Sequence, residues 1–145
     1  HFYDTYECKD NKFIAVGSIE PQFYSELLEK LEIDDKKFLD QYNKELWPEL
    51  KGLIALKIKS KTRYEWNEIF SESDACVTPV LDMQEAQDHP HNVSRKAFIN
   101  IDGFNQPNAS PRYSKTKLEI KHNAKEVGVD LDDICNEFNI SKEAF

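Results

Sequence analysis

The sequence predicts an α+β fold in which a β-hairpin and a small antiparallel sheet pack with several helices. Two stretches near the start, residues 2–8 and 12–16, carry the aromatic and β-branched residues of strands around a turn at residues 9–11. After Pro21, apolar residues recur at helical spacing in several successive stretches. At 145 residues, the chain suits one domain with a substantial core.

A strand-to-helix corner joins these two parts, and its candidate functional residue is Glu20. Gly17 permits backbone angles that other residues resist, and Pro21 suits the first helical position because it has no N–H to leave unpaired. Pro21 also keeps Glu20 out of the helical region, so the Glu20 carboxylate lies near the positive end of the helix dipole. This position suits an acid or base in catalysis, but it is also a routine position for a helix cap, which the spacing alone favours.

Four helices are expected after the corner. The first starts at Pro21, a short second helix is capped by Asp34-Asp35, a longer third helix covers about 46–58, and the fourth opens at a capping box in 62–65. The residues expected to face the core share helical spacing within each helix: Phe23, Leu27, Leu28, Leu31, Phe38, Leu39, Tyr42, Leu46, Leu50, Leu53, Ile54, Ile58, Trp66, Ile69 and Phe70.

The sequence of the middle of the chain predicts short strands and helices. Residues 75–81 form an apolar run interrupted by Pro79, which favours an edge strand or an extended crossing segment. Asp82 can cap a brief helix, and residues 96–101 alternate as a strand does. The run His89-Pro90-His91 invites a metal interpretation, but no third ligand of suitable spacing is near it, so a turn is expected instead.

The last part of the chain is expected to pack little. Residues 103–117 show no periodicity and predict an extended connection, whereas Asp130 starts a clear helix and Ser141 resembles the cap of another. We therefore expect a small α+β domain over 1–103, followed over 104–145 by an extended connection and a truncated helical segment.

Composition limits the classes of partner. The net charge of -8 argues against nucleic acid, because phosphate binding requires a basic face. No apolar run approaches the roughly 20 residues of a membrane span. The three cysteines, Cys8, Cys76 and Cys135, are odd in number and widely spaced, which fits a reducing compartment better than a disulfide framework.

Six blocks of the sequence resemble the α-methylacyl-CoA racemases of the family III CoA-transferase superfamily. They stand in the family's order, and together they are specific although no single one is diagnostic. The blocks are YDTYEC (3–8), FIAVGSIEPQFY (13–24), SKTRYEW (60–66), DACVTPVL (74–81), HPHNVSR (89–95) and PRYSKT (111–116). The resemblance covers the C-terminal portion of such an enzyme, which implies that this chain is a fragment containing its small domain.

The resemblance implies an isomerase that removes and returns the α-proton of 2-methyl-branched acyl-CoA thioesters. Glu20 matches a glutamate that lines the family's active site and becomes the candidate catalytic residue. Gln22, Tyr24, Val77 and Pro79 become candidate substrate-binding residues. Packing is the favoured interpretation for Gln22 and Tyr24, and it is at least equally good for Val77 and Pro79. The principal histidine and aspartate of the family lie in a preceding domain, so we expect the isolated chain to be inactive.

The resemblance also implies partners and a location. In the family, the small domain of one subunit closes the active site of the other within an interlocked homodimer. Coenzyme A is part of the substrate, and no separate cofactor or metal is expected. The family suggests lipid breakdown in the peroxisome or the mitochondrion.

Two other functions stay open at this point. A CoA-transferase of the same superfamily uses an aspartate nucleophile that would also lie outside these residues, and an acidic α+β unit could act as a non-catalytic interaction module. The lysines of the third helix and the segment after it, Lys51, Lys57, Lys59 and Lys61, could attract the phosphates of coenzyme A or form a solvated face.

Overall fold

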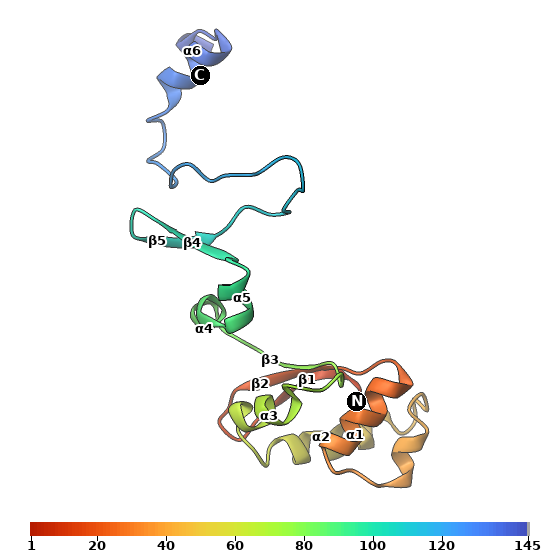
Figure 1. The fold of residues 1–145 in the computed structure, drawn as a ribbon. Coiled ribbons are helices and arrows are strands. Elements are labelled where there is room, and N and C mark those ends of the chain that lie inside the picture. Colours follow the sequence, from red (N-terminus) through yellow and green to blue (C-terminus); the bar gives the residue numbers. More distant parts are fainter. Residues whose placement is uncertain (145) are drawn as a thin grey trace. The chain divides into compact units, whose positions relative to one another are not determined.

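The computed structural model describes residues 1–144 (Figure 1). The chain forms two compact units, of which the first is His1–Leu81 and the second begins at Asp82. Helices and small antiparallel sheets make an α+β fold, which confirms the predicted fold class. The domain boundary expected after residue 103 stays a prediction.

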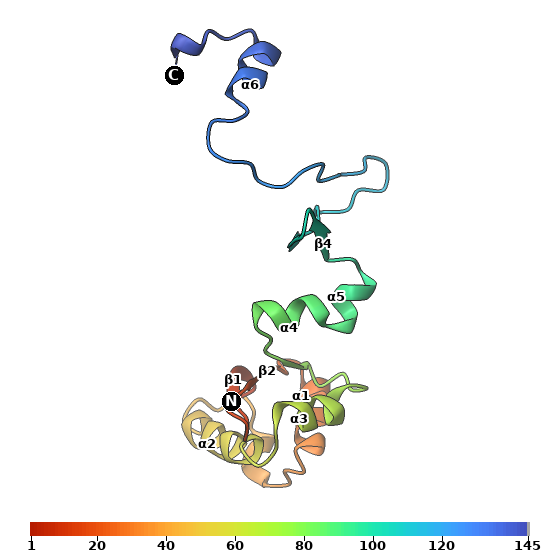
Figure 2. The same ribbon diagram turned by 90° about the vertical axis from the view of Figure 1, so that its left-hand side faces the viewer.

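The first unit contains a three-stranded antiparallel sheet of order β1-β2-β3. Strands β1 (Tyr3–Glu7) and β2 (Phe13–Gly17) form the predicted hairpin, and Asn11 takes the left-handed conformation in its turn (φ 60°). Strand β3 (Val77–Pro79) pairs with β2, which confirms the expected edge strand. Figures 1 and 2 show the helices of this unit on one side of the sheet.

Three helices and a 3-10 turn cover that side. They are α1 (Pro21–Lys30), η1 (Lys36–Leu39), α2 (Trp47–Ile58) and α3 (Arg63–Phe70). All four stand where the sequence predicts them, since proline opens α1, Asp35 caps η1 by accepting the N–H of Lys37, and Thr62 and Glu65 form the capping box of α3.

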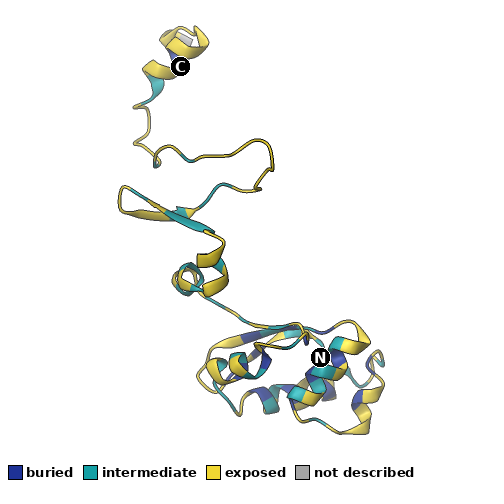
Figure 3. Cartoon of the chain, in the orientation of Figure 1, coloured by how far each residue is buried: buried dark blue, intermediate teal, exposed yellow. Residues whose placement is uncertain are grey.

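The hydrophobic core lies in the first unit, between the sheet and these helices. Figure 3 shows the buried residues gathered there, whereas the second unit is mostly exposed. The large side chains that are almost completely buried come from every element of this unit except the edge strands: Ile14, Leu27, Leu31, Phe38, Leu50, Ile54, Ile58 and Trp66.

Three residues expected in the core lie outside it. Leu39 is 81% exposed, Tyr42 57% and Leu53 36%, whereas Phe38 is buried as predicted. For Leu39 and Tyr42, the reason is that η1 is a single 3-10 turn, too short for a second inward position after Phe38, and that the chain leaves the helix at Asp40. Leu53 is not among the buried residues of α2. Tyr42 instead uses its hydroxyl to contact the corner before α1.

The second unit consists of small elements. They are α4 (Met83–Asp88), α5 (Pro90–Ser94), β4 (Phe98–Ile101), β5 (Phe104–Pro107), α6 (Leu131–Phe138) and η2 (Lys142–Ala144). Asp82 caps α4 in a capping box with Glu85, and Asp130 precedes α6, as the sequence predicts. Within the described residues, no helix has the length and apolar character needed to cross a membrane.

The structure corrects two expectations in this unit. His89-Pro90-His91 does not form a simple turn, because Pro90 starts helix α5 with His89 at its N-cap. The segment after Gly103 is not wholly an extended connection, because β5 pairs with β4 in a second hairpin. Asp102 and Gly103 both have positive φ, at 51° and 86°, which is the geometry that closes a tight hairpin.

We predict that residues 1–81 fold without the rest of the chain. Every member of the core cluster lies between Tyr6 and Ala75, so removal of residues 82–145 takes nothing from it. Circular dichroism of the shortened chain should show one cooperative thermal transition within a few degrees of that of the whole chain. A gradual, non-cooperative melt would mean that the second unit contributes to the core.

Candidate functional site

The candidate site is the corner between β2 and α1, where Glu20 occupies the N-cap position of the helix. Its backbone is extended (φ -74°, ψ 142°), and its carbonyl accepts the Tyr24 N–H at 2.9 Å, which starts the helix. Its side chain makes no capping hydrogen bond and is exposed. The carboxylate is therefore not used in capping α1.

The two residues before β3, Ala75 and Cys76, hydrogen-bond to the first residues of this corner. The Gly17 N–H donates to the Cys76 carbonyl at 2.9 Å, and the hydroxyl of the fully buried Ser18 donates to the Ala75 carbonyl at 2.5 Å. Buried polar groups need such partners, because an unpaired one costs about 1–3 kcal/mol. These two bonds fix the direction in which the chain leaves β2 towards Glu20.

Two residues between η1 and α2 donate hydrogen bonds to the last backbone carbonyls before Glu20. The Gln41 side-chain amide donates to the carbonyls of Ser18 and Ile19, at 3.1 and 3.0 Å, and the Tyr42 hydroxyl donates to the Ile19 carbonyl at 2.7 Å. Sequence reasoning missed this role of Gln41 and Tyr42, because nothing in the local pattern shows which distant backbone a side chain will reach.

Cys76 lies beside the corner and is another residue that sequence reasoning missed. It is exposed and has a left-handed backbone (φ 54°), an uncommon conformation for a residue with a side chain. Desolvation raises the pKa of its thiol, and the negative charges of Glu20, Asp74 and Glu26 raise it further. The Glu20 carboxylate is thus close enough to act electrostatically on this thiol.

An open pocket of about 460 Å³ occupies the outer face of the sheet next to the corner. Gly17 and Cys76 form the part of its wall that adjoins the corner; the other residues that line it are Tyr3, Asp4, Thr5, Ala15, Val16 and Thr78. Asp4 is paired with Lys51, whose hydrogen bond holds the pKa of that carboxyl below its usual value. The pocket is thus a partly apolar surface bordered by the Glu20 corner.

The four candidate substrate-binding residues do not gather at this pocket. Gln22 is exposed on the first turn of α1, whereas Tyr24 is buried and its hydroxyl lies 2.9 Å from Nε2 of His1. Val77 packs against the core and Pro79 pairs with the buried Ile14, so both lie on the inner side of β3. Their contact with a substrate stays a prediction.

The two paired lysines of α2, Lys51 and Lys57, and Lys59 directly after the helix are engaged in ion pairs. Lys57 pairs with Glu32 at 3.0 Å and Lys59 with Glu7 at 3.1 Å, in addition to the pair between Lys51 and Asp4. These pairs favour the solvated, ion-paired face over a phosphate-binding one. Among the described residues, no group of three His, Cys, Asp or Glu side chains is arranged to hold a metal ion.

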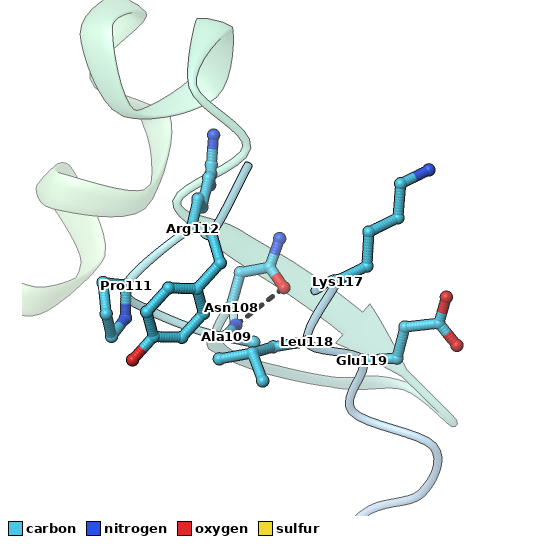
Figure 4. A pocket seen from close by; sticks show the side chains of 8 residues that line it. Asn108, Ala109, Pro111, Arg112, Lys117, Leu118 and Glu119 are labelled. Atoms are coloured by element: carbon cyan, nitrogen blue, oxygen red, sulfur yellow. Dashed lines mark hydrogen bonds between the residues drawn. The ribbon is translucent and has the colours of Figure 1, made fainter. Parts of the chain in front are cut away.

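A second pocket, of about 240 Å³, lies within the second unit around Pro111 and Leu118 (Figure 4). Arg112 is part of its wall, but its guanidinium already donates to the carbonyls of Arg95 and Lys96. Lys117 and Glu119 add opposite charges to the same pocket. This arrangement presents no concentration of one charge, so we place the candidate site at the Glu20 corner.

The chain is similar to known proteins over nearly its whole length. The sequence matches the family described as CoA-transferase family III over residues 1–130. It is 39% identical to α-methylacyl-CoA racemase of Mus musculus and 37% identical to that of Homo sapiens, in each case over 98% of this chain and 38% of the relative. The chain thus spans less than half the length of these relatives.

A nematode protein and a solved bacterial structure extend the comparison. The CaiB/baiF CoA-transferase family protein ZK892.4 of Caenorhabditis elegans is 36% identical over 76% of this chain and 31% of its own length. A crystal structure of Rv3272 from Mycobacterium tuberculosis superposes with a TM-score of 0.67 at 16% identity, over 83% of this chain and 34% of that one. A D175A mutant of the same protein gives a TM-score of 0.69 at 16% identity, over 88% and 38%. The solved structures share the fold, and the sequence match over residues 1–130 shows that the chain belongs to CoA-transferase family III.

Proposed function

We propose that this chain is part of an α-methylacyl-CoA racemase, in which Glu20 is one of the ionisable groups at the active site. The observation that carries the proposal is the exposed Glu20 carboxylate, which makes no capping bond and follows by three residues Gly17, a residue that lines an open pocket. The similarity of 37–39% to two proteins named α-methylacyl-CoA racemase, over 98% of this chain, supports it.

The chemistry of racemisation explains why one carboxylate is not enough. The α-proton leaves one face of the carbon and a proton returns to the other, which requires acid/base groups on both sides and donors for the enolate oxygen. We infer that the remaining length of the enzyme supplies the principal pair, because this chain covers 38% of its relatives. Glu20 then orients that pair or takes part in the proton transfer.

CoA transfer between carboxylic acids is the second candidate. It is favoured by the family description and by the nematode relative, which is named for that family. The two functions differ in their products, because a racemase exchanges the α-proton with solvent whereas a transferase produces a new thioester. An assay of the full-length enzyme with one acyl-CoA and no acceptor acid separates them, since only racemisation proceeds.

We predict that this chain alone binds coenzyme A thioesters only weakly, with a dissociation constant above about 1 mM. The net charge of -8 repels the coenzyme phosphates, and the lysines of α2 are already paired with carboxylates. Isothermal titration with an acyl-CoA checks this, with the full-length enzyme as the control. Micromolar binding by the chain would place the coenzyme site within these residues.

We predict that Glu20→Gln slows α-proton exchange in the full-length enzyme about 10²–10⁴-fold, the usual contribution of a positioned proton-transfer group. The free energy of unfolding should change by less than about 1 kcal/mol, because no side-chain cap is lost. Deuterium incorporation from heavy water and a thermal melt measure the two effects. Glu29→Gln, the same change at another exposed glutamate of α1, is the control and should keep the parental rate. Exchange at the parental rate in Glu20→Gln would refute the role.

We predict that Glu20→Gln also speeds the alkylation of Cys76 by iodoacetamide. The Glu20 charge raises the pKa of the thiol, so its removal lowers that pKa and increases the thiolate fraction at pH 8. The gain should be roughly two-fold, as expected for exposed, solvent-screened charges, and should vanish at a pH well above the thiol pKa. Cys8 and Cys135 are buried and should stay unmodified in the folded chain. An unchanged rate would mean that the carboxylate points away from Cys76.

A further inference from the structure

Gln41 is a buried polar residue whose side-chain amide binds the backbone in front of Glu20. It lies in the turn between η1 and α2, and it is 7% exposed. Its side-chain nitrogen donates to the carbonyls of Ser18 and Ile19. Both partners are acceptors, so the amide must present its NH₂ group to them, and the orientation of the side chain is thereby determined.

The two carbonyls that Gln41 holds have no place in the regular structure. Strand β2 ends at Gly17 and helix α1 begins at Pro21, so Ser18 and Ile19 belong to neither element. Ser18 is fully buried, and its carbonyl therefore needs a partner within the protein. Without the Gln41 amide, the corner has to turn this carbonyl towards water.

The direction of the Ile19 carbonyl bears directly on Glu20. This carbonyl belongs to the peptide group that joins Ile19 to Glu20, so its orientation and the Glu20 φ of -74° are fixed together. Two donors hold it, Gln41 at 3.0 Å and the Tyr42 hydroxyl at 2.7 Å. A rotation of this peptide moves the Cβ of Glu20, and with it the whole side chain.

The turn that carries Gln41 is itself held in place. The indole N–H of Trp47, in the first turn of α2, donates to the Gln41 carbonyl at 2.9 Å. The ring of Trp47 packs edge-on against Phe2, and Phe2 packs in the same way against Tyr42. Gln41 is therefore a fixed support that reaches across to the corner from a different part of the fold.

We propose that Gln41, assisted by Tyr42, is a positioning residue that sets where the Glu20 carboxylate points during catalysis. This inference rests on the proposed function of Glu20. Gln41 does not contact the substrate in this proposal, and it acts only through the peptide groups of Ser18 and Ile19. A misplacement of a reacting group by about 1 Å can cost up to 10²-fold in rate, so even a small relaxation of the corner is measurable.

The test is a double-mutant cycle in the full-length enzyme with Gln41→Met and Glu20→Gln. Methionine keeps the length of the side chain and removes both donors. We expect Gln41→Met to lower kcat for α-proton exchange about ten-fold, with KM unchanged within about two-fold. In the Glu20→Gln background the same change should have no further effect on kcat, although it still lowers the melting temperature, because there is no longer a carboxylate to position.

Ile54→Val is the matched control for stability. Ile54 is a fully buried apolar residue of α2 in the same core, and its shortening should lower the melting temperature by a similar number of degrees. Its kcat should remain at the parental value. A ten-fold loss in this control would show that reduced stability alone explains the effect of Gln41→Met, and would overturn the proposal.

The remaining outcomes separate this inference from the proposed function. Equal losses from Gln41→Met with and without Glu20 would overturn the positioning role while leaving Glu20 catalytic. A parental rate for Glu20→Gln alone would refute the proposed function, and the positioning role with it.

If Gln41→Met does not fold, Tyr42→Phe takes its place, since it removes one hydroxyl from a side chain that is 57% exposed. We expect it to lower kcat about two- to three-fold only when Glu20 is present; no loss, or an equal loss in both backgrounds, would overturn the proposal.

Discussion

The backbone between β2 and α1 is partly buried and belongs to no regular element, so its polar groups need hydrogen-bond partners from other parts of the first unit. Residues 18 and 19 leave the sheet before the helix has begun, so neither the strand ladder nor the helix can pair their carbonyls. The Ser18 hydroxyl is bound to the Ala75 carbonyl before β3, and the two carbonyls are bound by Gln41 from the turn before α2. Three segments that are far apart in sequence therefore meet at one corner. The sheet order β1-β2-β3 follows in part from this meeting, because the Gly17 N–H bond to Cys76 brings β3 alongside β2.

The residues that stabilise the first unit and the open pocket next to the corner lie on different faces of the sheet. On the inner face of the sheet, Tyr6, Ile14 and Val16 pack with the helices and form part of the hydrophobic core. The outer face carries the open pocket, whose wall includes Gly17 and Cys76 beside the corner, and Glu20 is exposed with no part in the core. Strand alternation produces this division, since neighbouring residues point to opposite faces. Substitutions on the outer face can therefore change binding or catalysis while the apolar burial that stabilises the unit stays intact.

Local signals predicted most of the elements, and long-range contacts account for what was missed. Proline at the start of α1 and the Thr62–Glu65 capping box act within one turn, so the residues around them contain the whole signal. The predicted inward position of Tyr42 was wrong because helical spacing was extended past the end of η1. The roles of Gln41 and Cys76 were not visible, since their partners lie more than twenty residues away and no pattern of neighbours encodes them. The β4–β5 hairpin had a local signal, Asp102-Gly103, which was interpreted as the end of a strand when it was the turn between two.

The identity of residue 20 is better explained by the proposed function than by stability. Asp35, Thr62 and Asp82 cap their helices with side-chain hydrogen bonds, as short polar side chains do well. Glutamate is one carbon longer than aspartate, and at the start of α1 it makes no such bond. A good capping residue contributes about 0.5–2 kcal/mol, so a sequence selected only for the stability of α1 would favour serine, threonine or aspartate at this position. The Glu20 carboxylate instead stays exposed, and its charge acts on the thiol of Cys76, a residue that lines the neighbouring pocket.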